Sequence, residues 1–213
     1  MGLGEKLRAR VGGHVSRKMV HVSAGSWIWM WRFFNPSHWA WRLNILIPAV
    51  YSLELIYRGL INPDPNHKLV QKLSRSGDPI ELIRGPLMFS TLMCVVGLGL
   101  FQRAEGATIM AVLGWGDGLS SLFGQRFGKL SWRYRTPFGQ TKSLIGSVSC
   151  FLGSLLGMMV FRFALGTPGW SSSWLLFAVI GTLVEAVSPP EFDNLLMPAA
   201  VHAVELLLRT PVA

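Results

Sequence analysis

The sequence predicts an all-α, polytopic membrane protein, and three observations support this prediction. Half of the 213 residues are hydrophobic and only 15% are charged, which is more apolar side chain than a water-soluble core buries. The apolar residues fall in long blocks and not in the stripe of an amphipathic helix. A hydrocarbon layer of about 30 Å is crossed by about 20 mostly apolar helical residues, and about seven stretches of the chain approach that length.

The predicted membrane spans occupy most of the chain. In chain order they are residues 19–34, 39–61, 84–101, 105–124, 143–165, 170–188 and 192–209. No internal repeat or linker divides them, so residues 1–213 are expected to form a single domain. Residues 1–18 lack the apolar core and cleavage site of a signal peptide and are expected to be retained. Cys94 and Cys150 lie inside predicted spans, so both are interpreted as small apolar residues and not as a disulfide.

Basic residues are concentrated in alternate connections between the spans. One set precedes span one or lies around the connections after spans two and four: Lys6, Arg8, Arg10, Arg17, Lys18, Arg58, Lys68, Lys72, Arg75, Arg84, Arg126, Lys129, Arg133, Arg135 and Lys142. The opposite connections hold Arg32, Arg103 and Arg162, with Arg42 and Arg209 near the same side. Basic residues are retained on the cytoplasmic side of a membrane. We therefore expect a cytoplasmic amino terminus and an outer carboxyl terminus.

Two further features agree with this topology. Tryptophans crowd the first outer turn, as in an interfacial aromatic belt: Trp27, Trp29, Trp31, Trp39 and Trp41. The net charge of +9 is explained by the basic residues of the inner connections, so nucleic acid is not an expected partner. The expected environment is the lipid bilayer, and the oligomeric state is not predicted.

The fourth span, GWGDGLSSLFGQRFGK, places a carboxylate in the membrane. Asp117 precedes Arg126 by nine residues, which puts it about 13 Å below the cytoplasmic edge of a regular helix. Ionisable groups at such depth are costly and mark functional sites unless a partner explains them. Asp117 therefore requires a cation, a metal ion or a hydrated cavity.

Small and polar residues share one face of this span. Steps of three, four and seven bring side chains together on a helix, and the residues so spaced are Asp117, Ser120, Ser121, Gly124 and Gly128. Helix packing is the alternative interpretation, because Gly114 and Gly118 form a GxxxG pair. Packing explains the glycines and leaves Asp117 unexplained.

The next connection, RFGKLSWRYRTPFGQTKSLIGS, is basic and ends with Thr141, Lys142 and Ser143 at the start of span five. A helix amino terminus with free N–H groups and a neighbouring lysine is suited to binding phosphate. We therefore favour a phosphate contact for Lys142. For Arg133 and Arg135 we favour anchoring of the loop at the membrane surface.

The connection VEAVSPPEFDNLLMP brings acidic residues to the same face. Glu185, Glu191 and Asp193 supply oxygen ligands of the kind that Mg²⁺ uses when it bridges nucleotide phosphates. Glu191 is expected to be the more exposed of the three. Helix capping is the alternative for Asp193, which with Asn194 opens the last helix.

Three further polar groups lie near the inner edge. Lys18 and His21 are three apart and share a face, where a snorkelling lysine and an interfacial histidine are the ordinary interpretation. Glu54 and Arg58, four apart, are expected to pair with each other. Glu81 and Arg84 are left open between a structural and a functional role.

These motifs resemble the CTP-dependent polyprenol kinases, the group of dolichol, phytol and farnesol kinases, which are distantly related to the CDP-diacylglycerol synthases. The resemblance runs from about Arg17 to Pro198 and rests on RKMVHVSAG, GWGDGLSSLFGQRFGK, TKSLIGS and VEAVSPPEFDNLLMP. It departs at Leu119, which is bulky, and at Ile145, where the synthases favour a glutamate. The second departure weakens the synthase reading more than the kinase one.

The resemblance implies roles for particular residues. Asp117 and Lys142 would serve the CTP phosphates and the metal ion, with His21 or a carboxylate assisting deprotonation of the alcohol. The implied nucleotide-binding residues are Lys18, Ser121, Gly124, Lys129, Ser143, Gly146 and Asn194. The implied Mg²⁺ ligands are Asp117, Glu185 and Asp193.

The expected function is CTP-dependent, Mg²⁺-assisted phosphorylation of a polyisoprenoid or related lipid alcohol at the cytoplasmic membrane face. No GxxxxGK[ST] motif is present, which argues against a P-loop kinase. A lipid-phosphate cytidylyltransferase is the first alternative, because its site requires much the same groups. A small transporter with Asp117 and Glu185 on an ion path is the second, and the absence of repeated halves argues against it.

Overall fold

The computed structural model describes residues 17–167 and 169–209. The predictions for residues 1–16, including the retained amino terminus and the placement of Lys6, Arg8 and Arg10, lie outside the described residues. Residues 17–25 are helical. The helical elements that follow are η1 (Ser26–Phe33), η2 (Trp39–Ile45), α2 (Leu46–Ile56), η3 (Tyr57–Ile61), α3 (Lys68–Leu73), η4 (Pro79–Ile83), α4 (Gly85–Gly99), α5 (Ala104–Met110), η5 (Ala111–Asp117), α6 (Gly118–Phe127), η6 (Gly128–Leu130), α7 (Leu144–Ala164), α8 (Ser173–Val187) and α9 (Asp193–Arg209).

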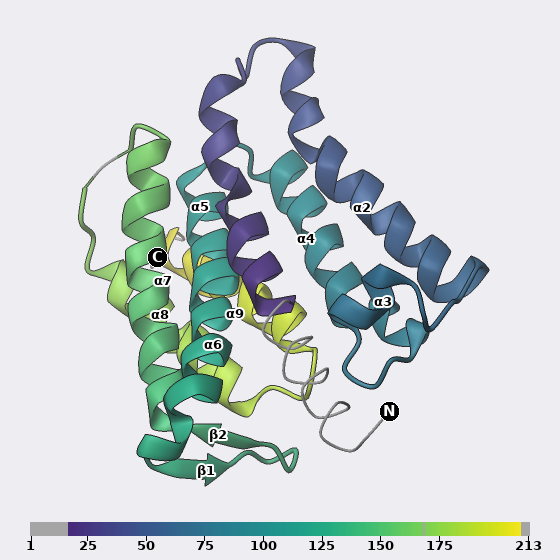
Figure 1. Ribbon diagram of the computed structural model, residues 1–213. Coiled ribbons are helices and arrows are strands. Elements are labelled where there is room, and N and C mark those ends of the chain that lie inside the picture. Colours follow the sequence, from purple (N-terminus) through teal and green to yellow (C-terminus); the bar gives the residue numbers. More distant parts are fainter. Residues whose placement is uncertain (1–16, 168, 210–213) are drawn as a thin grey trace.

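The prediction of a mostly helical protein is confirmed, and one short hairpin departs from it. Strand β1 (Arg133–Arg135) pairs antiparallel with β2 (Thr141–Ser143), with Tyr134 opposite Lys142. Gly139 in the connecting turn has φ +75°, a conformation that glycine adopts without steric cost. The hairpin lies at one end of the helical bundle, next to the start of α7 (Figure 1).

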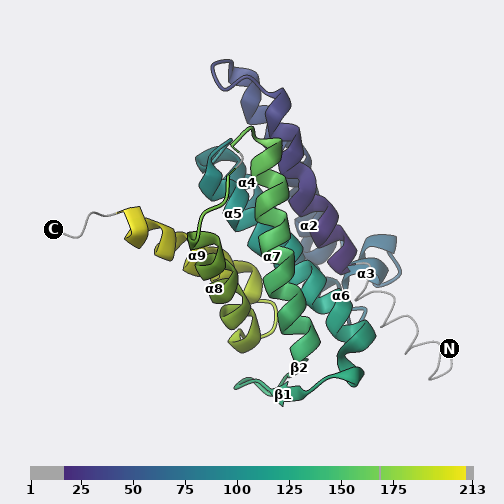
Figure 2. The same ribbon diagram turned by 90° about the vertical axis from the view of Figure 1, so that its left-hand side faces the viewer.

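The continuous segment α5–η5–α6 forms the centre of the bundle. It packs against α7 on one side and against the helical residues 17–25 on another, and α8 and α9 also contact it (Figures 1 and 2). Its residues from Glu105 to Gly114 are all buried. Neighbouring helices therefore surround this segment, which suits its small side chains.

Glycines allow the close approach of these helices. A Cβ added to Gly25 would lie 2.8 Å from the Cα of Gly114, and one added to Gly118 would lie 2.5 Å from a Val22 methyl. The packing interpretation of Gly114 and Gly118 is therefore correct for these glycines. The same contact holds residues 17–25 beside Asp117.

Gly25→Val is expected to lower the thermal unfolding midpoint of the purified protein, because overpacking a close backbone contact costs about 1–3 kcal/mol. Gly99→Val is the matched control, since no atom of the described residues lies within 4 Å of a Cβ at Gly99. Differential scanning fluorimetry in detergent measures both midpoints. Equal midpoints for the two variants would contradict the tight crossing.

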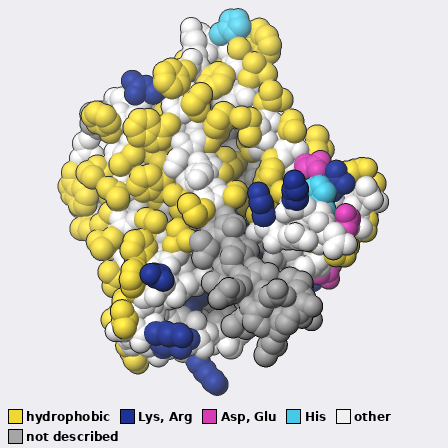
Figure 3. All heavy atoms as spheres, viewed as in Figure 1, with side chains coloured by type: hydrophobic (Ala, Val, Ile, Leu, Met, Phe, Trp, Pro, Cys, Tyr) yellow, Lys and Arg dark blue, Asp and Glu magenta, His cyan; other side chains and the backbone are white. Residues whose placement is uncertain are grey.

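Three helical stretches are long and apolar enough to cross a membrane: Trp39–Ile61, Pro79–Gly99 and Leu144–Ala164. Ser173–Val187 is apolar and shorter. The remaining predicted spans coincide with helices without meeting these criteria, so the total of seven stays a prediction. Figure 3 shows hydrophobic side chains covering the upper part of one face, with charged side chains gathered mainly lower and to the right.

Candidate active site

Four segments that are distant in sequence are joined to one another, or to the segment η5–α6, by close contacts. They are the helical residues 17–25, the hairpin with the start of α7, the carboxyl end of α8, and the turn into α9. Each carries a charged side chain into a buried or half-buried position, as the following contacts show.

Asp117 is the centre of the first group of charges. Its Oδ2 accepts a hydrogen bond from Lys18 Nζ at 2.5 Å and lies 3.4 Å from His21 Nδ1. All three side chains are nearly inaccessible, and the His21 ring stacks on Phe89 with centroids 3.8 Å apart. The prediction that Lys18 and His21 share a face is confirmed. Asp117 Oδ1 and both His21 nitrogens have no hydrogen-bond partner within residues 17–167 and 169–209.

A cavity of about 340 Å³ lies beside this group, and we call it the first cavity. Its lining residues come from α6, η6, the hairpin, the start of α7 and α8: Ser120, Ser121, Gly124, Gln125, Gly128, Lys129, Arg133, Gln140, Thr141, Lys142, Ser143, Gly146, Ser147 and Glu185. The nucleotide-binding set implied by the resemblance is thus largely brought together, namely Ser121, Gly124, Lys129, Ser143 and Gly146. Asp117 does not line the cavity, because its side chain faces residues 17–25.

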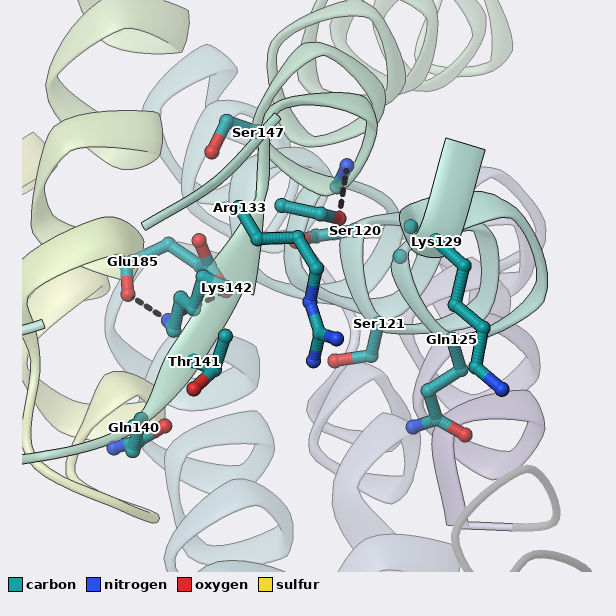
Figure 4. A pocket seen from close by; sticks show the side chains of 14 residues that line it. Ser120, Ser121, Gln125, Lys129, Arg133, Gln140, Thr141, Lys142, Ser147 and Glu185 are labelled. Atoms are coloured by element: carbon teal, nitrogen blue, oxygen red, sulfur yellow. Dashed lines mark hydrogen bonds and ion pairs between the residues drawn. The ribbon is translucent and has the colours of Figure 1, made fainter. Parts of the chain in front are cut away.

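Lys142 and Glu185 form the second group of charges, in the wall of the first cavity. Lys142 Nζ donates to Glu185 Oε1 at 2.7 Å and to the Glu185 backbone carbonyl. Lys142 extends from β2, whereas Glu185 lies on the last turns of α8 (Figure 4). Glu185 Oε2 is buried and has no hydrogen-bond partner in the part of the chain that the structure describes. Asp117 and Lys18 both act electrostatically on Glu185, so the two groups of charges are neighbours.

The start of α7 differs from the sequence prediction. Its first three N–H groups are occupied: Leu144 donates to the Trp132 carbonyl at 2.9 Å, Ile145 to Ser131 Oγ at 3.3 Å, and Gly146 to Ser143 Oγ at 3.2 Å. The prediction of free N–H groups at this helix start is therefore wrong. The hairpin and its approach supply the acceptors, which the basic composition of the connection did not indicate.

The first cavity offers an anion cationic side chains as hydrogen-bond donors, and not the N–H groups of α7. Lys129 and Arg133 are exposed, and neither has an ion-pair partner among the described residues. Figure 4 shows the Arg133 side chain reaching from β1 toward Ser121, with Lys129 on the far side. Arg133, which the sequence assigned to anchoring, thus lines the cavity; Arg135 does not.

The turn between α8 and α9 also differs from expectation. Glu191 is only 9% exposed and pairs with buried Arg17, Nη1 to Oε1 at 3.3 Å. The prediction that Glu191 is exposed is therefore wrong, because Arg17 holds it inside. Asn194 is buried and donates to the Gly85 carbonyl at 3.1 Å, whereas Asp193 is partly buried and accepts from the Asn194 N–H.

The carboxylates do not assemble a metal site from protein ligands alone. Among residues 17–167 and 169–209, no group of three or more His, Cys, Asp or Glu side chains is placed to hold a metal ion. Mg²⁺ is usually bound by one or two carboxylates together with substrate phosphates. The unpartnered oxygens Asp117 Oδ1 and Glu185 Oε2 fit that arrangement and do not fit a closed protein cage.

Two groups of charges were not predicted from the sequence. One is the Arg17–Glu191 pair, for which the only signal is the position of Arg17 next to Lys18. The other involves buried Glu105 on α5, which contacts His202 and lies 3.2 Å from Arg209 Nη2. The expected pair Glu54–Arg58 is confirmed, with Nε to Oε1 at 2.9 Å, and Cys94 and Cys150 are free thiols.

Comparison with known proteins identifies relatives with a common name. The chain is 30% identical to a probable chloroplastic phytol kinase 1 of Oryza sativa subsp. japonica over 217 residues, covering 96% of this chain and 68% of that protein. It is 30% identical to a probable chloroplastic phytol kinase 1 of Glycine max, covering 89% and 65%. The Arabidopsis thaliana chloroplastic phytol kinase 1 is 26% identical, with 87% and 64% covered. The chain thus spans about two thirds of these relatives. No protein-family model and no solved structure matches it.

Proposed function

The chain belongs to the phytol kinase family, and from that premise we propose that it transfers the γ-phosphate of CTP to the hydroxyl group of a polyisoprenoid or related lipid alcohol. The first cavity carries the proposal. It combines three cationic side chains, Lys129, Arg133 and Lys142, with serine and threonine hydroxyls at one end of an apolar helical bundle. Such a lining suits the phosphates of a nucleotide.

Phosphoryl transfer requires charge neutralisation and alignment more than covalent participation by the protein. In the proposed step the alcohol oxygen bonds to the γ-phosphorus, and the bond from that phosphorus to the bridging oxygen breaks. CDP leaves with the bonding electrons, and the hydroxyl proton passes to a base. Lys142 is proposed to offset the charge on the transferred group, and Lys129 and Arg133 to hold the remaining phosphates.

Asp117 and His21 are proposed to act next to the transferred group. Mg²⁺ bound with the nucleotide would supply further charge neutralisation, with Asp117 and Glu185 as its protein ligands. Neither His21 nitrogen has a hydrogen-bond partner among the described residues, and Nδ1 is the one that faces Asp117, at 3.4 Å from Oδ2. A histidine oriented by a carboxylate is suited to accept the hydroxyl proton. Lys18, whose Nζ lies at Asp117, is proposed to contact phosphate.

An apolar cavity of about 500 Å³ adjoins the first cavity and supports a lipid alcohol as acceptor. Val184, Val187, Leu196 and Ala200 are among its lining residues. Val184 precedes Glu185 in α8, and Gln140, which lines the first cavity, donates to the Ser188 carbonyl at 3.4 Å. A hydrocarbon chain here would bring its hydroxyl group close to the nucleotide cavity.

The labelling pattern of the product tests this function. With γ-labelled CTP and phytol in detergent micelles, we expect label in a lipid monophosphate, and with α-labelled CTP we expect label to stay in water as CDP. Removal of Mg²⁺ by EDTA should stop the transfer. Recovery of α-label in a CDP-lipid would identify a cytidylyltransferase instead. Absence of transfer to every lipid alcohol and lipid phosphate would favour the transport alternative.

The proposal also includes seven spans with a cytoplasmic amino terminus, and cysteine labelling tests this topology. In a chain whose two native cysteines are replaced, a cysteine at Arg133 is expected to react with a membrane-impermeant maleimide only after the cytoplasmic side is opened. Ser37→Cys is the opposite-side control, because Ser37 is exposed and precedes the second predicted span. Labelling of Arg133→Cys in intact cells would overturn the orientation.

A further inference from the structure

A second cavity, also of about 340 Å³, lies between the segment leading into α4 and the turn into α9. It is lined by Arg75, Glu81, Arg84, Met88, Pro190, Glu191 and Phe192. It shares no lining residue with the first cavity. Two of its side chains are cationic, two are acidic and three are apolar, so its chemistry depends on which charges are already paired.

Both carboxylates of the second cavity are engaged within the protein. Glu81 Oε2 accepts from Ser74 Oγ at 2.9 Å and from the backbone N–H groups of Arg75 and Ser76. Glu191 Oε1 accepts from buried Arg17. Because these oxygens stabilise the local backbone and the Arg17 side chain, they are poorly placed to neutralise the cations of the cavity.

The guanidinium groups of the second cavity, in contrast, are not paired with carboxylates. Neither Arg75 nor Arg84 lies within ion-pair distance of a carboxylate among the described residues. Arg75 Nε is buried and has no hydrogen-bond partner among residues 17–167 and 169–209, and the same holds for Nε of Arg17, which is only 2% exposed. Burial, and then the charge of Arg17, lower the pKa of Arg75, with Glu191, Asp193 and Glu81 acting in the opposite direction.

We propose that the second cavity binds a phosphate monoester carried on a hydrocarbon chain, that is, a lipid phosphate. The planar guanidinium groups of Arg75 and Arg84 suit bidentate binding of phosphate oxygens, and a phosphate monoester carries a charge of about −1.5 to −2 at neutral pH. The anion balances the desolvated charge of Arg75 and the uncompensated charge of Arg84.

The apolar lining residues favour a lipid over a free phosphate ion. Met88 lies in the candidate span Pro79–Gly99, and Phe192 is 47% exposed. Hydrocarbon bound along Met88, Pro190 and Phe192 would bury these surfaces while the phosphate faces the arginines. The site does not require the kinase activity proposed for the first cavity, although that activity would itself produce a lipid phosphate monoester.

Native mass spectrometry of the full chain in detergent tests the proposal with dilauroyl phosphatidic acid as the probe and dilauroyl phosphatidylcholine as the headgroup control. We expect one bound phosphatidic acid per chain and weaker binding of phosphatidylcholine. Arg75→Gln and Arg84→Gln should each raise the dissociation constant of phosphatidic acid by about tenfold or more. Arg58→Gln and Lys72→Ala should not change it, since neither residue lines the first or the second cavity.

Each other outcome overturns part of the proposal. Equal affinity of the wild type and both arginine variants would exclude the second cavity as the site. Equal affinity for the two lipids would exclude phosphate monoester recognition. Inorganic phosphate binding as tightly as phosphatidic acid, with the same dependence on the arginines, would exclude the lipid as the ligand. Arg84 is exposed, so Arg84→Gln keeps the test decisive if Arg75→Gln fails to fold. A negative result in the CTP labelling experiment would leave the expected binding of phosphatidic acid unchanged.

Discussion

Asp117→Asn is expected to lower kcat for lipid phosphorylation by about 10³-fold or more, because it removes the proposed metal-binding charge beside the transferred phosphate. The same substitution leaves Lys18 buried opposite a neutral group. Removing one partner of a buried ion pair costs about 3–5 kcal/mol of folding stability. Loss of activity in this variant alone therefore does not separate catalysis from folding.

A second substitution separates the two effects. Lys18 and Asp117 form one ion pair, so Asp117→Asn combined with Lys18→Met removes the unpaired charge. We expect the double variant to recover most of the thermal stability of the wild type and to remain inactive. Near-normal turnover in the double variant would show that Asp117 acts only in the structure of the bundle. Steady-state transfer of γ-label and the unfolding midpoint, measured on the same preparation, report both quantities.

Lys142→Ala is expected to lower kcat by about 10²- to 10³-fold, because the proposed interaction strengthens as charge develops in the transition state. KM for CTP should change less than kcat, since an interaction made mainly in the transition state contributes little to ground-state binding. Initial rates over a range of CTP concentrations measure this split. A large rise in KM with unchanged kcat would assign Lys142 to binding only.

Two variants control for indirect effects of this substitution. Lys72→Ala removes an exposed lysine of α3 that lines neither the first nor the second cavity, and it should leave kcat unchanged. Lys142→Ala leaves the Glu185 carboxylate without its ion-pair partner. Combining it with Glu185→Gln removes that carboxylate, so the double variant should regain the folding stability that the single variant loses. If the double variant also regains turnover, the role of Lys142 is to neutralise Glu185 and not to contact phosphate.

Local periodicity and the resemblance predicted which residues lie together in part of the candidate site. The spacing of Lys18 and His21 placed both on one helix face, and both meet Asp117. The resemblance implied a nucleotide-binding set that includes Ser121, Gly124, Lys129, Ser143 and Gly146, and these five residues line the first cavity. These predictions succeeded because each depends on residues within one or two turns of a helix, or on two helices joined by a short connection.

Contacts between distant segments were not predictable in the same way. Arg17 and Glu191 are separated by 174 positions, and no helical or strand period links them. Glu191 also has φ +72°, a conformation that is uncommon outside glycine, asparagine and aspartate. Its burial therefore follows from tertiary structure. The hairpin was missed because its strands have three residues each, too few to show an alternating pattern.

Because the first N–H groups of α7 are occupied, added salt is expected to weaken anion binding in the first cavity. Fixed, buried backbone donors would bind an anion largely independently of ionic strength, whereas exposed cations such as Lys129 and Arg133 are surrounded by mobile counterions. At physiological ionic strength the screening length is about 8 Å, so added salt competes directly with such groups. The proposed binding of a nucleotide is thus expected to depend on the ionic composition of the adjacent aqueous compartment, and anionic lipids at the same surface would compete for the same cations.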